Sequence, residues 1–279
     1  MSTDSALVIP TAVGPVPLTI GERGVGRSVL LLHGGAGPAS VAMFADLFAA
    51  ATGTHVITPT HPGFGGSPRP EGLTTVAGLA ELYVGLMEAL ALDDVTVIGN
   101  SLGGWIAAEL ALLHSPRVGR IALVDAVGIE VPGSPMADIF TLTPSEIVEY
   151  SYYDPSKAVI PDPATLTPAS RQVVFGNRDA LGVYGGAMID HGLLARLGSI
   201  DVPALVLWGE ADRITAADYG RAYADAIPGA RFVLLERTGH VPQVETPTLL
   251  LDALRGFVSW SHRGTRSGGA RSGRNDRVH

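Results

Sequence analysis

The sequence predicts an α/β fold, in which a mostly parallel central sheet is flanked by helices and carries a helical cap insertion. The first observation is that short apolar runs alternate with longer stretches of helical periodicity, a pattern typical of consecutive βαβ units. The second is that this alternation breaks only once, between residues 131 and 200, where Pro, Tyr and Asp are frequent. Because this break separates two predicted strands, we expect it to lie over the carboxyl ends of the strands, where ligands bind in open α/β sheets.

The predicted strands are short runs rich in Val, Ile, Leu and other apolar residues. They lie at residues 28–32, 55–60, 95–98, 121–124, 204–208 and 232–235. The predicted helices have apolar residues at helical spacing and lie at residues 41–51, 79–90, 102–114, 216–226 and 247–260. The run at residues 16–20 precedes this alternation, and we expect it to add an antiparallel strand at the edge of the sheet.

Four segments follow from this order of elements. Residues 1–130 form the first part of the core domain, 131–200 a cap insertion with short helices, and 201–260 the second part of the core. Residues 261–279 form a disordered basic tail, since five arginines and one aspartate lie there among Gly and Ser, which leaves little apolar surface to bury. An arm that binds nucleic acid is the alternative for this tail.

Composition limits the partners that the chain can have. The 279 residues carry a formal net charge of −8, which argues against nucleic acid as the main partner. No apolar run reaches the roughly 18 residues of a membrane span, and the absence of cysteine excludes disulfides and thiolate metal sites. We expect a cytoplasmic monomer or homodimer that acts on a small-molecule substrate, with no metal and no cofactor.

The segment GNSLG, residues 99–103, lies where the predicted strand 95–98 gives way to a helix. A serine at the tip of so sharp a turn is strained, and strain of that kind is found at functional sites. Glycines at positions 99 and 103 leave room for the turn. We therefore predict Ser101 to be a nucleophile at the amino terminus of a helix, where free N–H groups favour a developing anion.

A serine nucleophile needs a base, and the base needs an acid that holds its tautomer. His240 follows the predicted strand 232–235 and Asp212 follows the strand 204–208, so both emerge at the same edge of the sheet as Ser101. We predict these three as the catalytic residues. Asp125, just beyond the strand 121–124, is the competing acid; the order Ser, acid, His favours Asp212.

The segment HGGAG, residues 33–37, follows the first core strand. Its glycines allow the backbone to approach a substrate oxygen, so we predict an oxyanion hole formed by the amides of Gly35 and Leu102. A dinucleotide-binding loop is the alternative, but Ser40 stands where its last glycine would be, and no acid ends the next strand.

These motifs, with HPGFGGS, WGEADRIT and GHVPQVE, resemble those of the α/β-hydrolase fold family over nearly the whole chain. The resemblance implies a Ser-His-Asp hydrolase. Within the family, the sequence is similar to small esterases and to hydrolases that cleave carbon–carbon bonds of ring-fission products. The second similarity rests on HGGAG, on Asn100 and on Asn177-Arg178, while Val241 departs from it because those enzymes usually carry Trp after the catalytic histidine.

We expect the substrate pocket to lie between the sheet and the cap. Gly34, Trp105, Arg178 and Val241 are the candidate substrate-binding residues, with Arg178 a partner for a substrate carboxylate. The departure at Val241 leads us to prefer a carboxylesterase acting on small apolar esters. A carbon–carbon bond hydrolase, a non-catalytic ligand receptor and a cofactor-free oxygenase are the alternatives.

Overall fold

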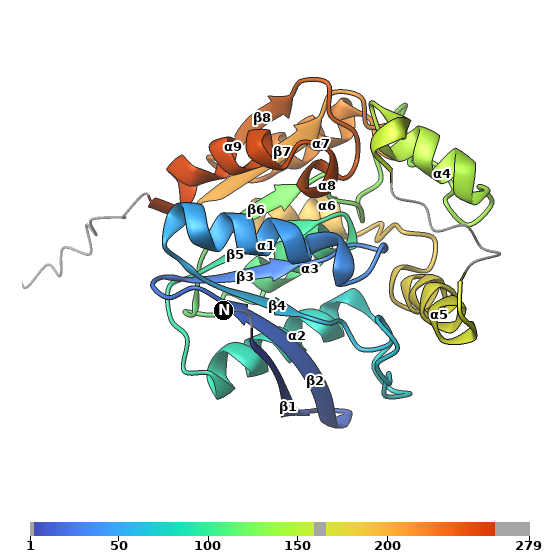
Figure 1. Ribbon diagram of the computed structural model, residues 1–279. Helices are drawn as coiled ribbons and strands as arrows, with labels where there is room; N and C mark the ends of the chain where they lie inside the picture. Colours follow the sequence, from blue (N-terminus) through green and yellow to red (C-terminus); the bar gives the residue numbers. More distant parts are fainter. Residues whose placement is uncertain (1–2, 159–165, 260–279) are drawn as a thin grey trace, which may run out of the picture.

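The computed structural model describes residues 3–158 and 166–259. The described residues form one eight-stranded sheet with the strand order β1-β2-β4-β3-β5-β6-β7-β8, which crosses the centre of the molecule (Figure 1). Its strands are β1 (Thr3–Thr11), β2 (Gly14–Arg23), β3 (Ser28–Leu32), β4 (His55–Pro59), β5 (Val95–Asn100), β6 (Val118–Val124), β7 (Ala204–Gly209) and β8 (Arg231–Leu235).

The six strands from β3 to β8 pair in parallel, as the alternation of strands and helices predicts. Strand β2 pairs antiparallel with β4, so the predicted strand at residues 16–20 exists with the expected direction. The prediction that it lies at the edge was wrong, because β1 pairs with its outer side over nine residues. Strand β1 escapes a search for apolar runs because most of its side chains are exposed or only partly buried.

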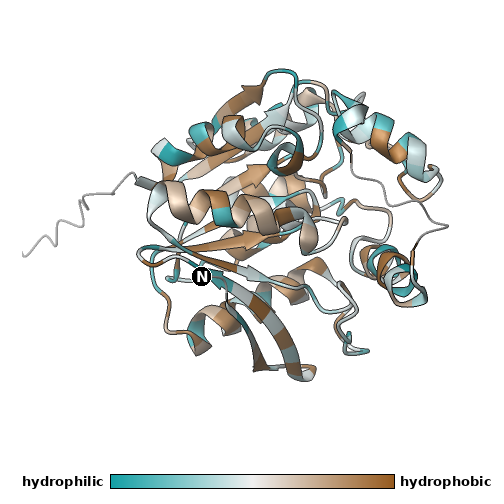
Figure 2. Ribbon diagram, viewed as in Figure 1, coloured by the Kyte–Doolittle hydropathy of each residue, from teal (hydrophilic) through white to brown (hydrophobic). Residues whose placement is uncertain are grey.

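Alternate residues of each central strand belong to two different hydrophobic clusters, one on each face of the sheet. Helices α1 (Ala39–Thr52) and α9 (Pro247–Ser259) pack on one face with Val29, Leu31 and Ile98. Helices α2 (Val76–Ala89), α3 (Leu102–Leu112) and α7 (Ala217–Ala226) pack on the other face with Leu30 and Leu32. Figure 2 shows brown apolar strands between helices that turn their brown side inward. Because the strands β3 to β8 are parallel, their carboxyl ends all lie at the same edge of the sheet.

Beyond that edge lie the helices of the segment that joins β6 to β7. Its longest helices are α4 (Pro144–Ser151) and α5 (Pro168–Gly185), which stand apart from the sheet in Figure 1. The expectation of short helices was wrong for α5, which has 18 residues. Shorter pieces follow as η1 (Pro155–Lys157), α6 (Leu193–Arg196), η2 (Leu197–Ser199) and, after β8, α8 (Pro242–Glu245).

Two predictions fall partly or wholly outside the described residues. The basic tail at 261–279 lies outside them, as do residues 159–165 of the predicted cap. Within the described part of the chain, no helix is long and apolar enough to cross a membrane.

Candidate active site

Ser101 occupies the sharp turn between β5 and α3. Its backbone has φ 56° and ψ −117°, a conformation that is costly for any residue with a side chain. The flanking positions have no room for a Cβ atom, since one on Gly99 would lie 2.0 Å from the carbonyl oxygen of Gly103. A Cβ on Gly103 would lie 2.3 Å from the carbonyl oxygen of Leu32. The glycine spacing of the sequence thus has a direct steric cause.

Ser101, His240 and Asp212 form a continuous hydrogen-bonded chain at the carboxyl ends of three strands. Ser101 Oγ lies 3.0 Å from His240 Nε2, and His240 Nδ1 lies 2.8 Å from Asp212 Oδ2. An ionised carboxylate can only accept, so Nδ1 carries the imidazole hydrogen and Nε2 is left to accept the serine hydroxyl proton. The side chains of His240 and Asp212 are 8% and 0% exposed, so water competes little for these bonds.

Four donors hold the carboxylate of Asp212. Oδ1 accepts the amides of Ile214 (2.8 Å) and Thr215 (3.1 Å), and Oδ2 accepts the Thr215 hydroxyl (3.0 Å) as well as His240. Such a donor set favours the charged form of a carboxyl group. Thr215 is one functional residue that the sequence interpretation missed, although it lies in the quoted WGEADRIT motif.

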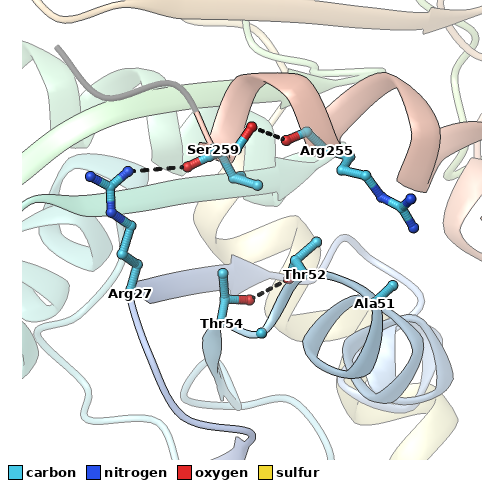
Figure 3. Close-up of a pocket in the computed structure, with 8 residues that line it drawn as sticks. Arg27, Ala51, Thr52, Thr54, Arg255 and Ser259 are labelled. Carbon is cyan, nitrogen blue, oxygen red and sulfur yellow. Dashed lines mark hydrogen bonds between the residues drawn. The ribbon is translucent and has the colours of Figure 1, made fainter.

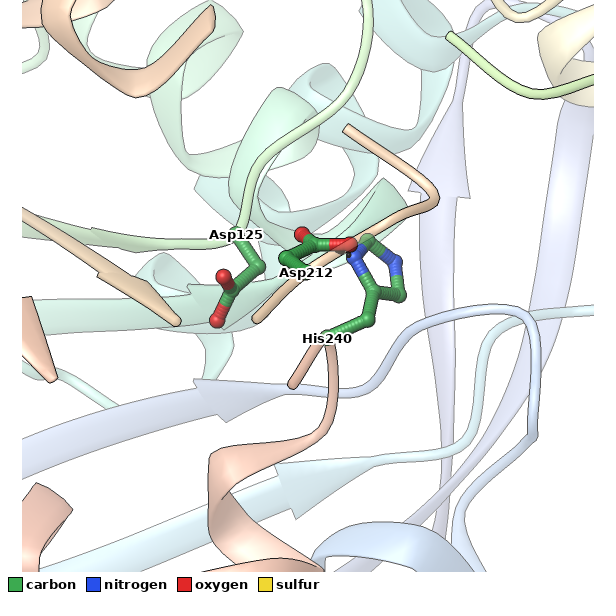
Figure 4. Close-up of side chains that lie close together, drawn as sticks. All are labelled: Asp125, Asp212 and His240. Atoms are coloured by element: carbon green, nitrogen blue, oxygen red, sulfur yellow. Dashed lines mark hydrogen bonds and ion pairs between the residues drawn. The ribbon is translucent and has the colours of Figure 1, made fainter. Parts of the chain in front are cut away.

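Asp125, the competing acid, does not pair with His240. Its Oδ1 instead accepts the amide of Gly209 at 2.7 Å. Figure 4 shows Asp125 beside the Asp212–His240 pair, and one ligand atom from each of the three lies within 4.8 Å of the others. This is the one group among the described residues spaced to hold a metal ion. Because the facing atoms of Asp212 and His240 already bond to each other, we interpret the group as a proton-handling site.

Three polar side chains fix the histidine loop, and the sequence interpretation named only Asn100 among them, without this role. Asn100 Nδ2 donates to the carbonyl of His240 (3.0 Å), and Gln243 Nε2 donates to Asn100 Oδ1 (3.1 Å). The buried carboxylate of Glu245 accepts the amides of Gly239 (2.7 Å), Asp154 (2.7 Å) and Tyr153 (3.2 Å). Gln243 and Glu245 both belong to the GHVPQVE motif, whose spacing was their only signal in the sequence.

The loop after β3 lies directly beside the serine. A Cβ atom on Gly34 would come within 2.9 Å of Ser101 Cβ, and one on Gly35 within 2.7 Å of Leu181 Cδ2 from α5. The amides of Gly35 and Leu102 donate no hydrogen bond to any described residue, so both remain available to an anion. Leu102 begins α3, where the helix dipole adds to the attraction of negative charge.

A network of buried hydrogen bonds supports this loop. His33 Nδ1 contacts the carbonyl of Gly34 (2.8 Å), His33 Nε2 accepts the amide of His61 (3.1 Å), and His61 Nε2 contacts the carbonyl of His33 (2.9 Å). The Tyr83 hydroxyl bonds to His61 Nδ1. Burial lowers the pKa of His33 to about 4 and holds that of His61 well below its usual range. Both rings are therefore neutral and act as a structural support.

The remaining predicted residues lie in three different settings. Trp105 is 5% exposed and its ring packs against Gly128 within the core, a place that argues against its predicted role in substrate binding. Arg178 on α5 is half-buried, donates to the carbonyl of Phe140 and lies 5.8 Å from the centre of that ring. Val241 is partly exposed directly after His240.

Two pockets elsewhere contain none of the three hydrogen-bonded residues. One of about 200 Å³ lies between α1 and α9, at the opposite end of the strands from Ser101, and Arg27 and Arg255 contribute to its wall (Figure 3). The other, of about 420 Å³, is lined mainly by apolar residues of the segment 129–136. Neither pocket holds a nucleophile with an adjacent base.

Comparison with known proteins decides the family. A model of the alpha/beta hydrolase family matches residues 29–253. The chain belongs to this family. The sheet and its helices therefore form an α/β-hydrolase fold, and the chain is a hydrolase of the α/β family.

Relatives of this α/β-hydrolase include hydrolases named for unsaturated 2-hydroxy acids. It is 29% identical to a 2-hydroxy-6-oxononadienedioate/2-hydroxy-6-oxononatrienedioate hydrolase of Paraburkholderia phymatum and to a 2-hydroxymuconate semialdehyde hydrolase of Pseudomonas putida. Each match covers 80% of this chain and 84% of the relative. A meta-cleavage product hydrolase of Pseudomonas fluorescens has a similar structure, with a TM-score of 0.71 and 22% identity over 90% of this chain and 97% of that one. This last likeness concerns the fold alone.

Proposed function

We propose that this α/β-hydrolase is a serine hydrolase in which Ser101, His240 and Asp212 act as the catalytic triad. The observation that carries the proposal is the unbroken hydrogen-bonded chain from Ser101 Oγ through His240 to Asp212. A nucleophile, a base and an orienting acid in this geometry are the parts that acyl transfer requires.

Each residue has one task in the proposed mechanism. His240 Nε2 takes the proton of Ser101 Oγ as the oxygen attacks the substrate carbonyl carbon, and Asp212 stabilises the imidazolium that forms. The amides of Gly35 and Leu102 stabilise the oxyanion, where one such donor contributes about 3 kcal/mol. His240 then gives the proton to the leaving group. A water molecule next attacks the acyl carbon while His240 takes its proton, and His240 returns that proton to Ser101 Oγ as the acyl group leaves.

We propose that the bond cleaved is the carbon–carbon bond of a ring-fission dienone. The relatives reported above support this branch, so the preference for a carboxylesterase that we drew from Val241 is reversed. The dienol must first tautomerise to its 2-oxo form, which moves a proton onto the carbon next to the ketone carbonyl. After Ser101 Oγ has added to that carbonyl, the carbon–carbon bond breaks, the 2-oxo group accepts the electron pair through the conjugated double bond, and the resulting dienolate takes the proton from His240. Arg178 on α5 is the cation that we propose for the substrate carboxylate, because a guanidinium forms strong paired bonds with carboxylates.

A carboxylesterase is the second candidate function. Two observations favour it: Val241 stands in place of the tryptophan of the dienone hydrolases, and the guanidinium of Arg178 is already engaged by Phe140. An ester needs only an apolar acyl slot and the oxyanion hole, with no cation.

A substrate panel distinguishes these functions. We expect a 2-hydroxy-6-oxo-dienoate to be cleaved with a kcat/KM at least about 100-fold above that of p-nitrophenyl acetate, a difference of about 2.7 kcal/mol in barrier. Both activities disappear in Ser101→Ala, whereas Ser170→Ala on the exposed start of α5 serves as the matched control. Turnover of the ester alone would favour the esterase. Turnover of neither, together with tight binding of the dienoate, would favour a receptor.

The cap, the assembly state and the location complete the proposal. We propose that the helices of the segment 131–200 set specificity, which the contact of Leu181 with Gly35 supports. A small-molecule substrate is consistent with the relatives. A monomeric or homodimeric state and a cytoplasmic location remain predictions from the sequence.

A further inference from the structure

Asp125 is a second carboxyl group directly behind the proposed triad. It follows β6 and is completely buried. Its Oδ1 accepts the amide of Gly209 at 2.7 Å, but Oδ2 is buried with no donor group in reach among the described residues. A buried carboxylate oxygen without a donor is costly. A protonated oxygen in the same place is itself a donor and needs only an acceptor.

The acceptor is the neighbouring carboxylate of Asp212. Asp212 has four donors and Asp125 has one, so a single negative charge is most stable on Asp212. Two buried carboxylates this close cannot both be charged without a large repulsion. Burial, first of all, and then the charge of Asp212 and a side-chain hydrogen bond with it raise the pKa of Asp125 well above its usual range, against the opposing effect of the Gly209 amide.

We propose that Asp125 is a positioning residue of this hydrolase that works as a neutral carboxylic acid, donating its proton to the carboxylate of Asp212. The inference rests on the proposed triad. The Asp125–Asp212 pair then carries one proton and one negative charge, and the bond from Asp125 helps to hold the carboxylate of Asp212 in place. The only other titratable group in this cluster is His240 itself, whose ring faces Asp212 through Nδ1.

Infrared spectroscopy of the full-length protein at neutral pH tests the protonation state without any substrate. We expect the C=O stretching band of a protonated carboxyl group in the wild type. The band persists in Ser101→Ala and in Asp201→Asn, an exposed aspartate, but disappears in Asp125→Asn. The absence of the band from the wild type, or its persistence in Asp125→Asn, would overturn the proposal, whatever the enzyme's substrate is.

Kinetics test whether the neutral acid acts on the triad. Asp125→Asn keeps one acceptor and one donor, whereas Asp125→Ala removes both, so we expect kcat for p-nitrophenyl acetate to be at least about tenfold higher in Asp125→Asn than in Asp125→Ala, about 1.4 kcal/mol in barrier. Replacing a triad aspartate by asparagine costs up to about 10⁴-fold. In Asp212→Asn, however, the repulsion from Asp212 is removed and the new amide group can donate to Asp125. We therefore expect Asp125 to ionise there, against the opposing effect of its burial, and to supply a charge near His240.

The double variant isolates this effect. We expect kcat of Asp125→Asn/Asp212→Asn to be at least about tenfold below that of Asp212→Asn, a difference of about 1.4 kcal/mol in barrier. Equal activity of these two variants would show that Asp125 has no electrostatic access to His240 and would contradict the proposal. Full activity of Ser101→Ala on the same ester would instead refute the triad itself, so the two failures are distinguishable.

Discussion

At the scale of single residues, the proposed active site combines a strained serine with neighbours that hold it in place. The positive φ of Ser101 costs about 1–3 kcal/mol. Two hydrogen bonds offset this strain: the Ser101 amide donates to the carbonyl of Val124 at 2.9 Å, and the Ser101 hydroxyl bonds to His240. Glu245 does not contact Ser101. Its carboxylate accepts amides from both the histidine loop and the segment after α4 and so links the two.

Glu245→Gln is expected to destabilise the protein by about 2 kcal/mol. The side-chain NH2 group would replace one carboxylate oxygen, so a buried backbone N–H would lose its acceptor. Urea unfolding measures this change. We also expect kcat to fall, since Gly239 directly precedes His240, the proposed base. Glu236→Gln, at an exposed position, is the matched control. A stability equal to that of the wild type would show that the three amides find other acceptors.

At the scale of elements, the turn from β5 to α3 depends on close contact between backbones. Gly103→Ala is expected to lower the free energy of unfolding by at least about 3 kcal/mol, because its Cβ would lie 2.3 Å from the carbonyl oxygen of Leu32 and the backbone must move. Gly256→Ala in α9 is the matched control, since a Cβ there meets no atom within 4 Å. We expect it to be neutral or to stabilise by about 0.5–1 kcal/mol. Chemical denaturation of both variants gives the comparison, and equal stabilities would refute the steric argument.

Helix α5 is tied to the loop that follows β4. Asn177 Oδ1 accepts the amide of Gly65 at 2.8 Å, and the Tyr184 hydroxyl donates to the carbonyl of Pro62 at 2.9 Å. Arg178 and Leu181 are three residues apart and so share a face of this helix. Since Leu181 contacts Gly35, Arg178 lies on the side of α5 that approaches the active-site loops.

Arg178→Ala is therefore expected to reduce kcat/KM for a dienoate by about 10–100-fold, the value of one charge-assisted hydrogen bond. Turnover of p-nitrophenyl acetate, which has no carboxylate, changes by less than about threefold. Arg171→Ala on the exposed start of the same helix controls for a general effect of charge. If both substrates lose activity equally, Arg178 supports the cap and does not bind the substrate.

The sequence predicted the elements that carry strong local signals and missed those that depend on distant partners. The spacing of Gly99, Ser101 and Gly103 is readable because the three residues lie within one five-residue segment, although the atom nearest a Cβ on Gly103 belongs to Leu32. Strand β1 and the length of α5 are not, because an exposed edge strand and a helix with a polar outer face lack a continuous apolar run. The roles of Glu245 and Asn100 depend on backbone groups more than 80 residues away in the chain, which no local pattern encodes.

At the scale of the whole molecule, stability is coupled to pH through buried histidines beneath the active-site loop. His33 is neutral in the folded state with a pKa of about 4, whereas an unfolded histidine titrates near 6.5. Between these values the unfolded chain binds more protons, so the contribution of His33 to stability is present at neutral pH and declines as the pH falls. Asp125 has the opposite effect. Its pKa is raised in the folded state, so its contribution to stability increases as the pH falls.

Comparing the pH dependence of the free energy of unfolding between His33→Gln and the wild type isolates the contribution of His33. We expect the wild type to lose up to about 1.4 kcal/mol per pH unit through His33 as the pH falls from about 6.5 toward 4. The free energy of unfolding of His33→Gln, measured in urea over the same range, should depend less on pH by that amount. His191→Gln, with a side chain that is 78% exposed, leaves the slope unchanged. An identical slope in His33→Gln and the wild type would contradict a neutral, buried His33.

The central claim is that Ser101 is a nucleophile activated by His240. Labelling with a fluorophosphonate, followed by mass spectrometry of the digested protein, tests this claim without knowledge of the substrate. We expect one adduct, on Ser101, that is absent from Ser101→Ala and forms at least about 100-fold more slowly in His240→Ala, because the hydroxyl is a weak nucleophile without its base. Labelling of Ser101→Ala at the same rate as the wild type would contradict it.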